Sequence, residues 1–251
     1  MNKHIQDILD NFKSIDLKTL ENNYSLLDRL DYKYLLNIRY LFPFLTELLK
    51  NEYKILEIKN NRIFTYKNLY FDTLDHQMYL FHHNGKTNRF KIRIREYIET
   101  SQMYLEIKQK YSNGRCIKYR KKINKFEDNS MINNFIENYS PYKIKELNKT
   151  LYNQFHRITL VNDYNIHRVT IDFNLKFKNN EFVYLPEIAI IEVKIPKELN
   201  YYFDRNIIKK FSLKQCNFSK YCIGIALTKN NIKKNNFKAT ILMINKIKNL
   251  N

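Results

Sequence analysis

Several stretches of the chain alternate apolar and charged residues with a period of two, which predicts β-strands whose two faces meet different surroundings. The clearest stretch is 90–97, and its two faces are Phe90, Ile92 and Ile94 against Lys91, Arg93 and Arg95. The alternation recurs at 103–110 and 117–123, with polar faces made of Tyr104, Glu106, Lys108 and Lys110, then Lys118, Arg120 and Lys122. We therefore expect neighbouring strands that share one basic face.

Three later strands add fewer charges each to this face. The charged faces then carry eleven cations and three carboxylates, namely Lys91, Arg93, Arg95, Lys108, Lys110, Lys118, Arg120, Lys122, Arg157, Arg168 and Lys194 against Glu106, Asp172 and Glu192. If the strands close into a barrel with these faces inward, the cations crowd together. A bound anion must then neutralise them, because unpaired buried charge is very costly. The alternative is that each charged face is turned outward to water.

Helical patterns fill the gaps between the strands. Pro43 interrupts the apolar face of one of them and predicts a helix start or a kink there. Ser130 and Ser219 are suited to cap later helices. The expected helices are 5–30, 37–50, 74–83, 130–139 and 219–227, with a short helical stretch after Pro141 and further strands at 53–58 and 63–71.

Charge and cysteine content limit the partners and the cellular compartment that we expect for the protein. The net charge of +19 at pH 7 predicts non-specific binding to nucleic acid or anionic membrane through electrostatics alone, and says little about purpose. The three cysteines, Cys116, Cys216 and Cys222, have no paired or zinc-like spacing, so we expect reduced thiols and a cytoplasmic protein. No apolar run approaches the roughly 20 residues of a membrane span, and the first residues are too charged for a secretory signal.

Eight short motifs occur in a particular order along the chain: 29–34 (RLDYKY), 70–73 (YFDT), 89–95 (RFKIRIR), 105–108 (LEIK), 118–120 (KYR), 168–172 (RVTID), 191–194 (IEVK) and 219–221 (SKY). Together they resemble the VTC domain, the polyphosphate polymerase domain of the vacuolar transporter chaperone family, within the triphosphate tunnel metalloenzymes. The resemblance implies an α+β fold, in which an antiparallel β-barrel forms a tunnel with helices packed outside. It divides the chain into an N-terminal helical region (1–28), a VTC-like domain (29–228) and a basic C-terminal tail (229–251), where 239–247 can form a helix.

The resemblance also implies roles for individual residues. Lys33, Arg93, Arg95, Lys108, Lys118, Arg157 and Arg168 look like phosphate-gripping residues, and Ser219 and Lys220 match a Ser-Lys pair at the start of a helix. Lys91, Arg120 and Lys194 lie on the same basic face and are expected to bind substrate. Glu192 resembles a metal-binding glutamate, and a carboxylate suits Mn²⁺ or Mg²⁺. Two positions depart from the family pattern, because Asn217 stands where a lysine is expected and Phe155 where a tyrosine is expected, although Lys214 could replace the missing lysine.

The implied reaction is transfer of the ATP γ-phosphate to a growing inorganic polyphosphate chain. Tunnel enzymes that hydrolyse triphosphates resemble this pattern, but they open with two or more glutamates beside a lysine, whereas the stretch 31–33 keeps one acidic residue. This difference favours a polymerase over a triphosphatase. A non-catalytic polyanion-binding module remains the third alternative.

Glu106 and Asp172 are predicted to pair with tunnel cations, and the adjacent His82 and His83 are expected at the surface.

Overall fold

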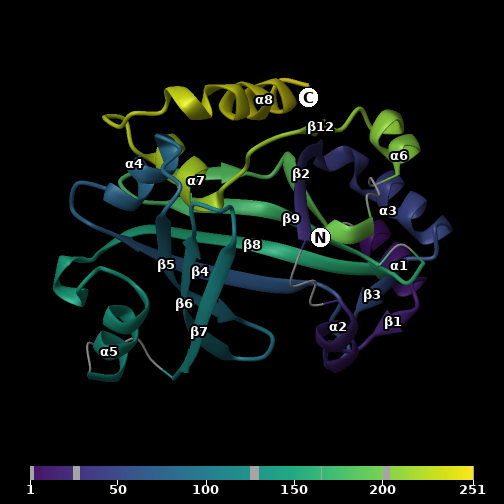
Figure 1. Ribbon diagram of the computed structural model, residues 1–251. Helices are drawn as coiled ribbons and strands as arrows, with labels where there is room; N and C mark the ends of the chain where they lie inside the picture. Colours follow the sequence, from purple (N-terminus) through teal and green to yellow (C-terminus); the bar gives the residue numbers. More distant parts are fainter. Residues whose placement is uncertain (1–2, 25–28, 125–129, 165, 200–203, 251) are drawn as a thin grey trace.

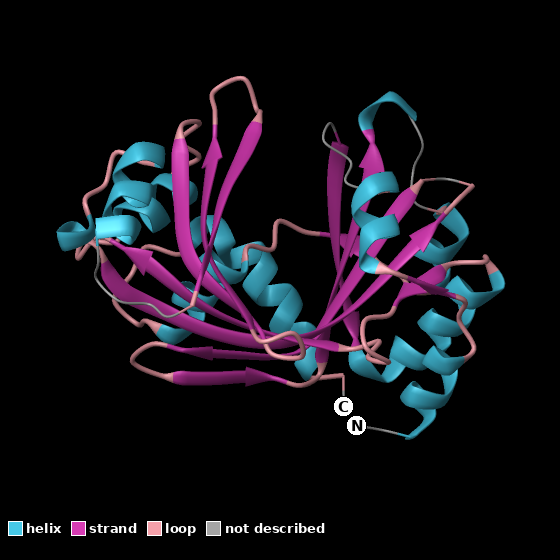
Figure 2. Cartoon of the chain, turned by 90° about the horizontal axis from the view of Figure 1, so that it is seen from below, coloured by secondary structure: helices cyan, strands magenta, loops and turns pink. Residues whose placement is uncertain are grey.

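The computed structural model describes residues 3–24, 29–124, 130–164, 166–199 and 204–250. Its strands form a twelve-stranded sheet with the order β12-β2-β11-β9-β8-β4-β5-β6-β7, while β1, β3 and β10 pair beside this path. Every pairing is antiparallel except that of β1 with β3. The path runs from β12 to β7, and in the described residues no backbone pairing joins these two ends. Figure 2 shows a strongly bent sheet with two arms and helices beside both.

The strands are β1 (Ser14–Ile15), β2 (Arg29–Asn37), β3 (Lys54–Leu56), β4 (Phe64–Asp72), β5 (Arg89–Tyr97), β6 (Gln102–Lys110), β7 (Cys116–Ile123), β8 (Asn148–Asn162), β9 (His167–Lys178), β10 (Phe182–Leu185), β11 (Ile188–Pro196) and β12 (Lys214–Gln215). The α-helices are α1 (Lys3–Asp10), α2 (Leu17–Asn23), α3 (Leu41–Lys50), α4 (Gln77–His83), α5 (Ser130–Tyr139), α6 (Arg205–Lys210), α7 (Lys220–Thr228) and α8 (Lys238–Lys248). Short 3₁₀ turns are η1 (Ile38–Tyr40), η2 (Ile144–Glu146), η3 (Lys197–Leu199) and η4 (Asn235–Phe237). The fold is the expected mixture of helices with an antiparallel sheet.

Three apolar clusters hold the helices against the sheet. One joins the apolar faces of β2, β9 and β11 to α1, α3 and α6, with Phe44 and Leu48 of α3 fully buried. A second packs α5 on the apolar faces of β5 and β6. The third holds α7 and α8 against the opposite face of the sheet, where α8 lies over α7 at one end of the molecule (Figure 1). These clusters leave the charged strand faces of β5 to β7 on the side away from α5.

Some local expectations are confirmed and others are wrong. Helix α5 begins and ends where the pattern places it, α7 follows its predicted cap, and the predicted helix at 239–247 is α8. Pro43 lies in the first turn of α3, so it marks a helix start. The long helix expected at 5–30 is wrong, because β1 interrupts it and Arg29 and Leu30 already belong to β2. No helix in the described ranges is long and apolar enough to cross a membrane.

Candidate functional site

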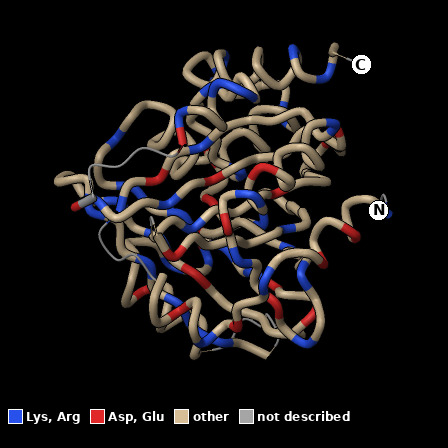
Figure 3. Tube along the Cα trace, turned by 90° about the vertical axis from the view of Figure 1, so that its right-hand side faces the viewer, with Lys and Arg blue, Asp and Glu red and all other residues tan. Residues whose placement is uncertain are grey.

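The strand register places the charged side chains of β5, β6 and β7 on one face. Lys91 lies opposite Lys108, which in turn lies opposite Lys118, so three lysines form a row across three strands. Directly opposed like charges destabilise a sheet unless something neutralises them. Lys110 and Lys122 lie further along the same faces, Lys110 opposite Arg89 and Lys122 opposite Tyr104. Lys122 is exposed, and Figure 3 shows that many other Lys and Arg positions are spread over the molecule.

Glu106 lies among the cations of these three strands and is almost fully buried. Its carboxylate is 2.6 Å from Nη2 of Arg93 and 3.5 Å from both Nζ of Lys118 and Nε of Arg120. Burial opposes ionisation of Glu106, but the charges of Arg93, Arg95 and Lys118 outweigh it and hold its pKa well below the ordinary value. Glu106 is therefore ionised at neutral pH and pairs with the cations around it.

Asp172 of β9 joins a strand cation to a helix cation. It accepts hydrogen bonds from Arg157 at 2.5 and 2.7 Å, in the two-pronged geometry that suits a guanidinium, and another from Nζ of Lys220. Phe155 lies beneath both cations, with its ring centroid 4.4 Å from Nζ of Lys220 and 5.3 Å from Cζ of Arg157. Phe155 lacks the hydroxyl of the expected tyrosine, but its ring still makes cation–π contacts with Lys220 and Arg157.

Glu192 of β11 lies between two lysines. Its oxygens are 3.4 Å from Nζ of Lys33, which β2 places directly opposite, and 3.9 Å from Nζ of Lys194. Burial opposes ionisation of Glu192, but Lys194, Lys33 and Arg157 hold its pKa well below the ordinary value. Burial, together with the charges of Arg168 and Arg157, lowers the pKa of Lys194 to about 7 despite the neighbouring glutamate.

Arg168 and Arg95 complete the basic face. Nε of Arg168 is buried and has no hydrogen-bond partner among the described residues. Burial and the charge of Arg157 lower the pKa of Arg168. Arg95 is buried too, donates to Asn68 at 2.8 Å and lies over the ring of Tyr66. A buried N–H group without a partner is costly, and a bound anion that accepts from Nε of Arg168 would remove that cost.

The start of α7 connects the two arms of the sheet. Ser219 caps the helix by accepting a hydrogen bond from the amide of Cys222, and Nζ of Lys91 on β5 donates to the same hydroxyl at 2.9 Å. Burial and the charges of Lys108 and Lys33 lower the pKa of Lys91 to about 8. Lys33 is on β2 and Lys108 on β6, so cations from both arms act on one ammonium group beside the helix N-terminus. Such a terminus, with its free N–H groups and dipole, favours an anion.

The structure therefore brings the thirteen predicted site residues together. They are Lys33, Lys91, Arg93, Arg95, Lys108, Lys118, Arg120, Arg157, Arg168, Glu192, Lys194, Ser219 and Lys220. The predicted pairing of Glu106 and Asp172 with cations is confirmed, and Glu192 also contacts two lysines. Cations still exceed carboxylates in this face, hereafter the basic face. Lys214, the candidate to replace the lysine missing at position 217, is exposed on β12 opposite Leu35.

The basic face offers one carboxylate, Glu192, that could hold a divalent metal. The described residues contain no group of three or more His, Cys, Asp or Glu side chains placed to hold a metal. Glu192 would thus be a single protein ligand, with phosphate oxygens and water completing the shell, as is usual for Mg²⁺ at phosphates. Its lowered pKa keeps the carboxylate ionised for this purpose.

Sequence reasoning missed several residues that support the basic face. Tyr70 accepts a hydrogen bond from Arg93 at 3.2 Å, and Asn68 orients Arg95. Both lie on β4 at positions opposite these arginines, so the alternation in β4 was the available signal. The surface placement expected for the histidine pair is wrong, because His83 is 2% exposed and contacts Asn236, while burial and the charges of Lys91 and Arg89 lower the pKa of His82 to about 2.

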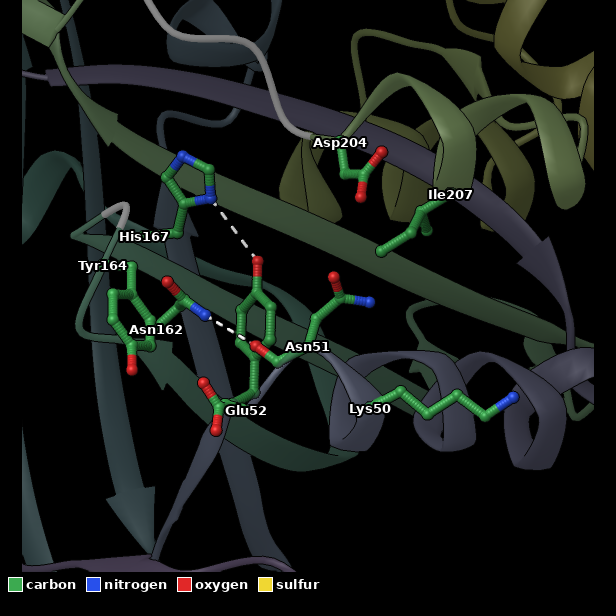
Figure 4. A pocket seen from close by; sticks show the side chains of 9 residues that line it. Lys50, Asn51, Glu52, Asn162, Tyr164, His167, Asp204 and Ile207 are labelled. Carbon is green, nitrogen blue, oxygen red and sulfur yellow. Dashed lines mark hydrogen bonds between the residues drawn. The ribbon is translucent and has the colours of Figure 1, made fainter.

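A separate pocket lies beside the turn between β8 and β9 (Figure 4). Tyr53 and His167 form a 3.4 Å hydrogen bond there, and Glu52, Asn162 and Asp204 line it as well. It contains one lysine, Lys50, in contrast to the rows of cations on the basic face. We therefore place the candidate site on the basic face.

Comparison with known proteins agrees with this architecture. The family model of the VTC domain matches residues 28–229, so the chain belongs to the VTC domain family. No relative was found among curated proteins. Among solved structures, a proposed adenylate cyclase from Bacillus halodurans has a TM-score of 0.52 at 15% identity, covering 76% of this chain and 94% of that one. This likeness shows a shared fold.

Two further structures are more distant. A proposed adenylate cyclase from Vibrio parahaemolyticus has a TM-score of 0.45 at 12% identity, with 79% of this chain and 99% of that one covered. A proposed adenylyl cyclase from Hippeastrum, for which a dominant triphosphatase activity is described, has a TM-score of 0.47 at 14% identity, with 81% and 98% covered.

Proposed function

We propose that this protein is a metal-dependent phosphotransferase that moves the γ-phosphate of ATP onto a growing inorganic polyphosphate chain along its basic face. The observation that carries the proposal is the convergence of Lys91, Ser219 and Lys220 at the start of α7, with cations from both arms of the sheet around them. Membership of the VTC domain family supports the same reaction.

The cations of the basic face would hold a triphosphate and an acceptor in line. Arg93 and Arg157 are each oriented by a carboxylate, which restricts them to one geometry before any substrate arrives. Prior orientation of this kind lowers the barrier because the groups need no rearrangement during reaction. Lys220 and the helix N-terminus would stabilise negative charge on the transferred group.

The chemistry needs no covalent enzyme intermediate. A terminal phosphate oxygen of the acceptor attacks the γ-phosphorus, a new P–O bond forms, and the bond to the β,γ-bridging oxygen breaks, so that ADP leaves with the electron pair. This acceptor oxygen is already ionised, and no general base is required. Mn²⁺ or Mg²⁺ bound to Glu192 and phosphate oxygens would neutralise part of the developing charge.

A triphosphatase is the second candidate. Hydrolysis must activate a water molecule, which needs a general base or further metal ligands beside Glu192. The described residues contain no such cluster of carboxylates, and this favours the polymerase. A polyanion-binding module would use the same cations without turnover.

One experiment separates these three functions. Purified protein is incubated with ATP and Mn²⁺, and the products are separated by size. A ladder of long phosphate chains supports the polymerase, free phosphate alone supports the triphosphatase, and unchanged ATP supports a binding module.

A further inference from the structure

Asp72, at the end of β4, is a fully buried carboxylate outside the basic face. Its Oδ1 accepts hydrogen bonds from the amides of Thr73 and Met78, both at 2.8 Å, and its Oδ2 accepts one from the amide of Tyr79 at 2.9 Å. His76 precedes α4 without capping it through its side chain. Asp72 therefore caps α4 from the neighbouring strand, which stabilises the helix start.

Asp72 also reaches α7. The hydroxyl of Tyr221, a buried residue in the first turn of α7, donates to Oδ2 of Asp72. The two residues before Tyr221 contact other strands, since Ser219 accepts from Lys91 of β5 and Lys220 donates to Asp172 of β9. Three consecutive residues thus tie the start of α7 to β4, β5 and β9.

A second contact connects Tyr221 with the arginines. The ring of Tyr221 stacks on that of Tyr70, with centroids 5.1 Å apart. The hydroxyl of Tyr70 accepts from Arg93, which in turn pairs with Glu106. A continuous series of contacts therefore runs from the buried Asp72 to Arg93 on the basic face.

We propose that Asp72 and Tyr221 are positioning residues for phosphate binding. Their hydrogen bond fixes the start of α7, so that Ser219, Lys220 and Arg93 keep their binding geometry before a ligand arrives. Fixing groups in advance strengthens binding because less freedom is lost on association. The inference rests on the proposed function, since it concerns the same site, but neither residue touches the phosphate.

The test compares two tyrosine variants. Tyr221→Phe removes only the hydroxyl that binds Asp72 and keeps the ring on Tyr70. Tyr79→Phe is the matched control, because the hydroxyl of this fully buried tyrosine donates to the carbonyl of Lys233 at 2.8 Å, while its ring beside Tyr221 and its amide hydrogen bond to Asp72 are kept. The dissociation constant for tripolyphosphate is measured by calorimetry at a temperature where all variants are folded, alongside thermal melts.

Both variants should melt at a lower temperature, but only Tyr221→Phe should bind tripolyphosphate about tenfold more weakly, as expected for losing one hydrogen bond to a charged group. Adding Asp72→Asn to Tyr221→Phe should weaken binding little further, since the contact with Tyr221 is already lost, while the weakened cap of α4 should lower the melting temperature again. Wild-type affinity in Tyr221→Phe, or an equal loss in Tyr79→Phe, overturns the inference. If the wild type itself fails to bind tripolyphosphate, the proposed function fails, and the inference fails with it.

Discussion

The side chains of the basic face have two different proposed roles. Some bind the phosphate anion directly, and Glu192 binds the metal. Glu192 lies between Lys33 and Lys194, and its carboxylate is the one we assign to metal. Lys108 is exposed on the same face of the sheet, in the row of three lysines. Substitutions at these two positions should therefore have different effects.

Glu192→Gln keeps the size of the side chain and removes its charge. We expect metal-dependent turnover of ATP to fall by about 10²-fold, because one preorganised electrostatic group is lost. Binding of tripolyphosphate in metal-free buffer should persist or tighten, since a negative charge near the anion is gone. Glu47→Gln is the control, because Glu47 pairs with Lys210 away from the basic face. Full activity with unchanged Mn²⁺ dependence in Glu192→Gln would refute the metal assignment.

Lys108→Ala should weaken tripolyphosphate binding with or without metal. The expected loss is about threefold to tenfold, because the side chain is exposed and solvent weakens each contact. Lys121→Ala is the matched control: Lys121 lies on β7 opposite Leu105, so it points to the other face of the sheet. Titration calorimetry at fixed salt measures both variants. Equal losses would mean that net charge alone attracts the anion.

At the scale of single elements, α7 has little room where it crosses the sheet. A Cβ on Gly224 would lie 2.5 Å from Leu151 and 2.7 Å from Phe177, and both side chains are buried. The glycine is therefore required for close approach of the helix to β8 and β9.

Gly224→Ala tests this packing. Helix propensity alone would stabilise the variant by about 1 kcal/mol. Overpacking costs roughly 1 to 3 kcal/mol, so we expect a net decrease in the free energy of unfolding. Urea denaturation gives the sign directly, and a more stable variant would show that Leu151 and Phe177 can move aside.

The elements differ in how well the sequence predicts them. In β5 to β7 one face is apolar and the other charged, so alternation reveals both the strands and the side on which Arg93 and Lys118 lie. Strand β2 was missed because residues 34–37 are all buried, so its pattern does not alternate. The pairing of Lys220 with Asp172 also could not be predicted, because it depends on where α7 crosses the sheet.

At the scale of the whole molecule, the buried lysines make stability and anion binding depend on pH in opposite directions. Burial is the main cause that lowers the pKa of Lys194 to about 7 and those of Lys91 and Lys220 to about 8, against 10.5 for an ordinary lysine. The unfolded chain therefore holds more protons than the folded protein above about pH 7. The free energy of unfolding of the protein should therefore rise with pH wherever the unfolded state binds more protons than the folded state.

Between about pH 7 and 8.5 we expect the ligand-free protein to become more stable, by at most ~1.4 kcal/mol per pH unit for each titrating lysine. Affinity for sulfate, whose own charge is constant in this range, should fall over the same interval because the ammonium groups lose their protons. Urea melts with and without sulfate measure both trends. Lys194→Met should reduce the pH dependence of both the free energy of unfolding and the sulfate affinity. If neither quantity changes with pH in the wild type, the lysines keep their charge over this range.

The pairing of β2 with β11 joins two segments that are more than 150 residues apart in the sequence. During synthesis, β2 must wait until β11 has left the ribosome, and such distant pairing is slow to form. Meanwhile the apolar residues of β2 have an open edge, and exposed edges of this kind promote aggregation. Lys33 likewise has no Glu192 beside it until the last strands arrive. We therefore expect the yield of correctly folded protein to depend on the same pairing that places Lys33 beside Glu192.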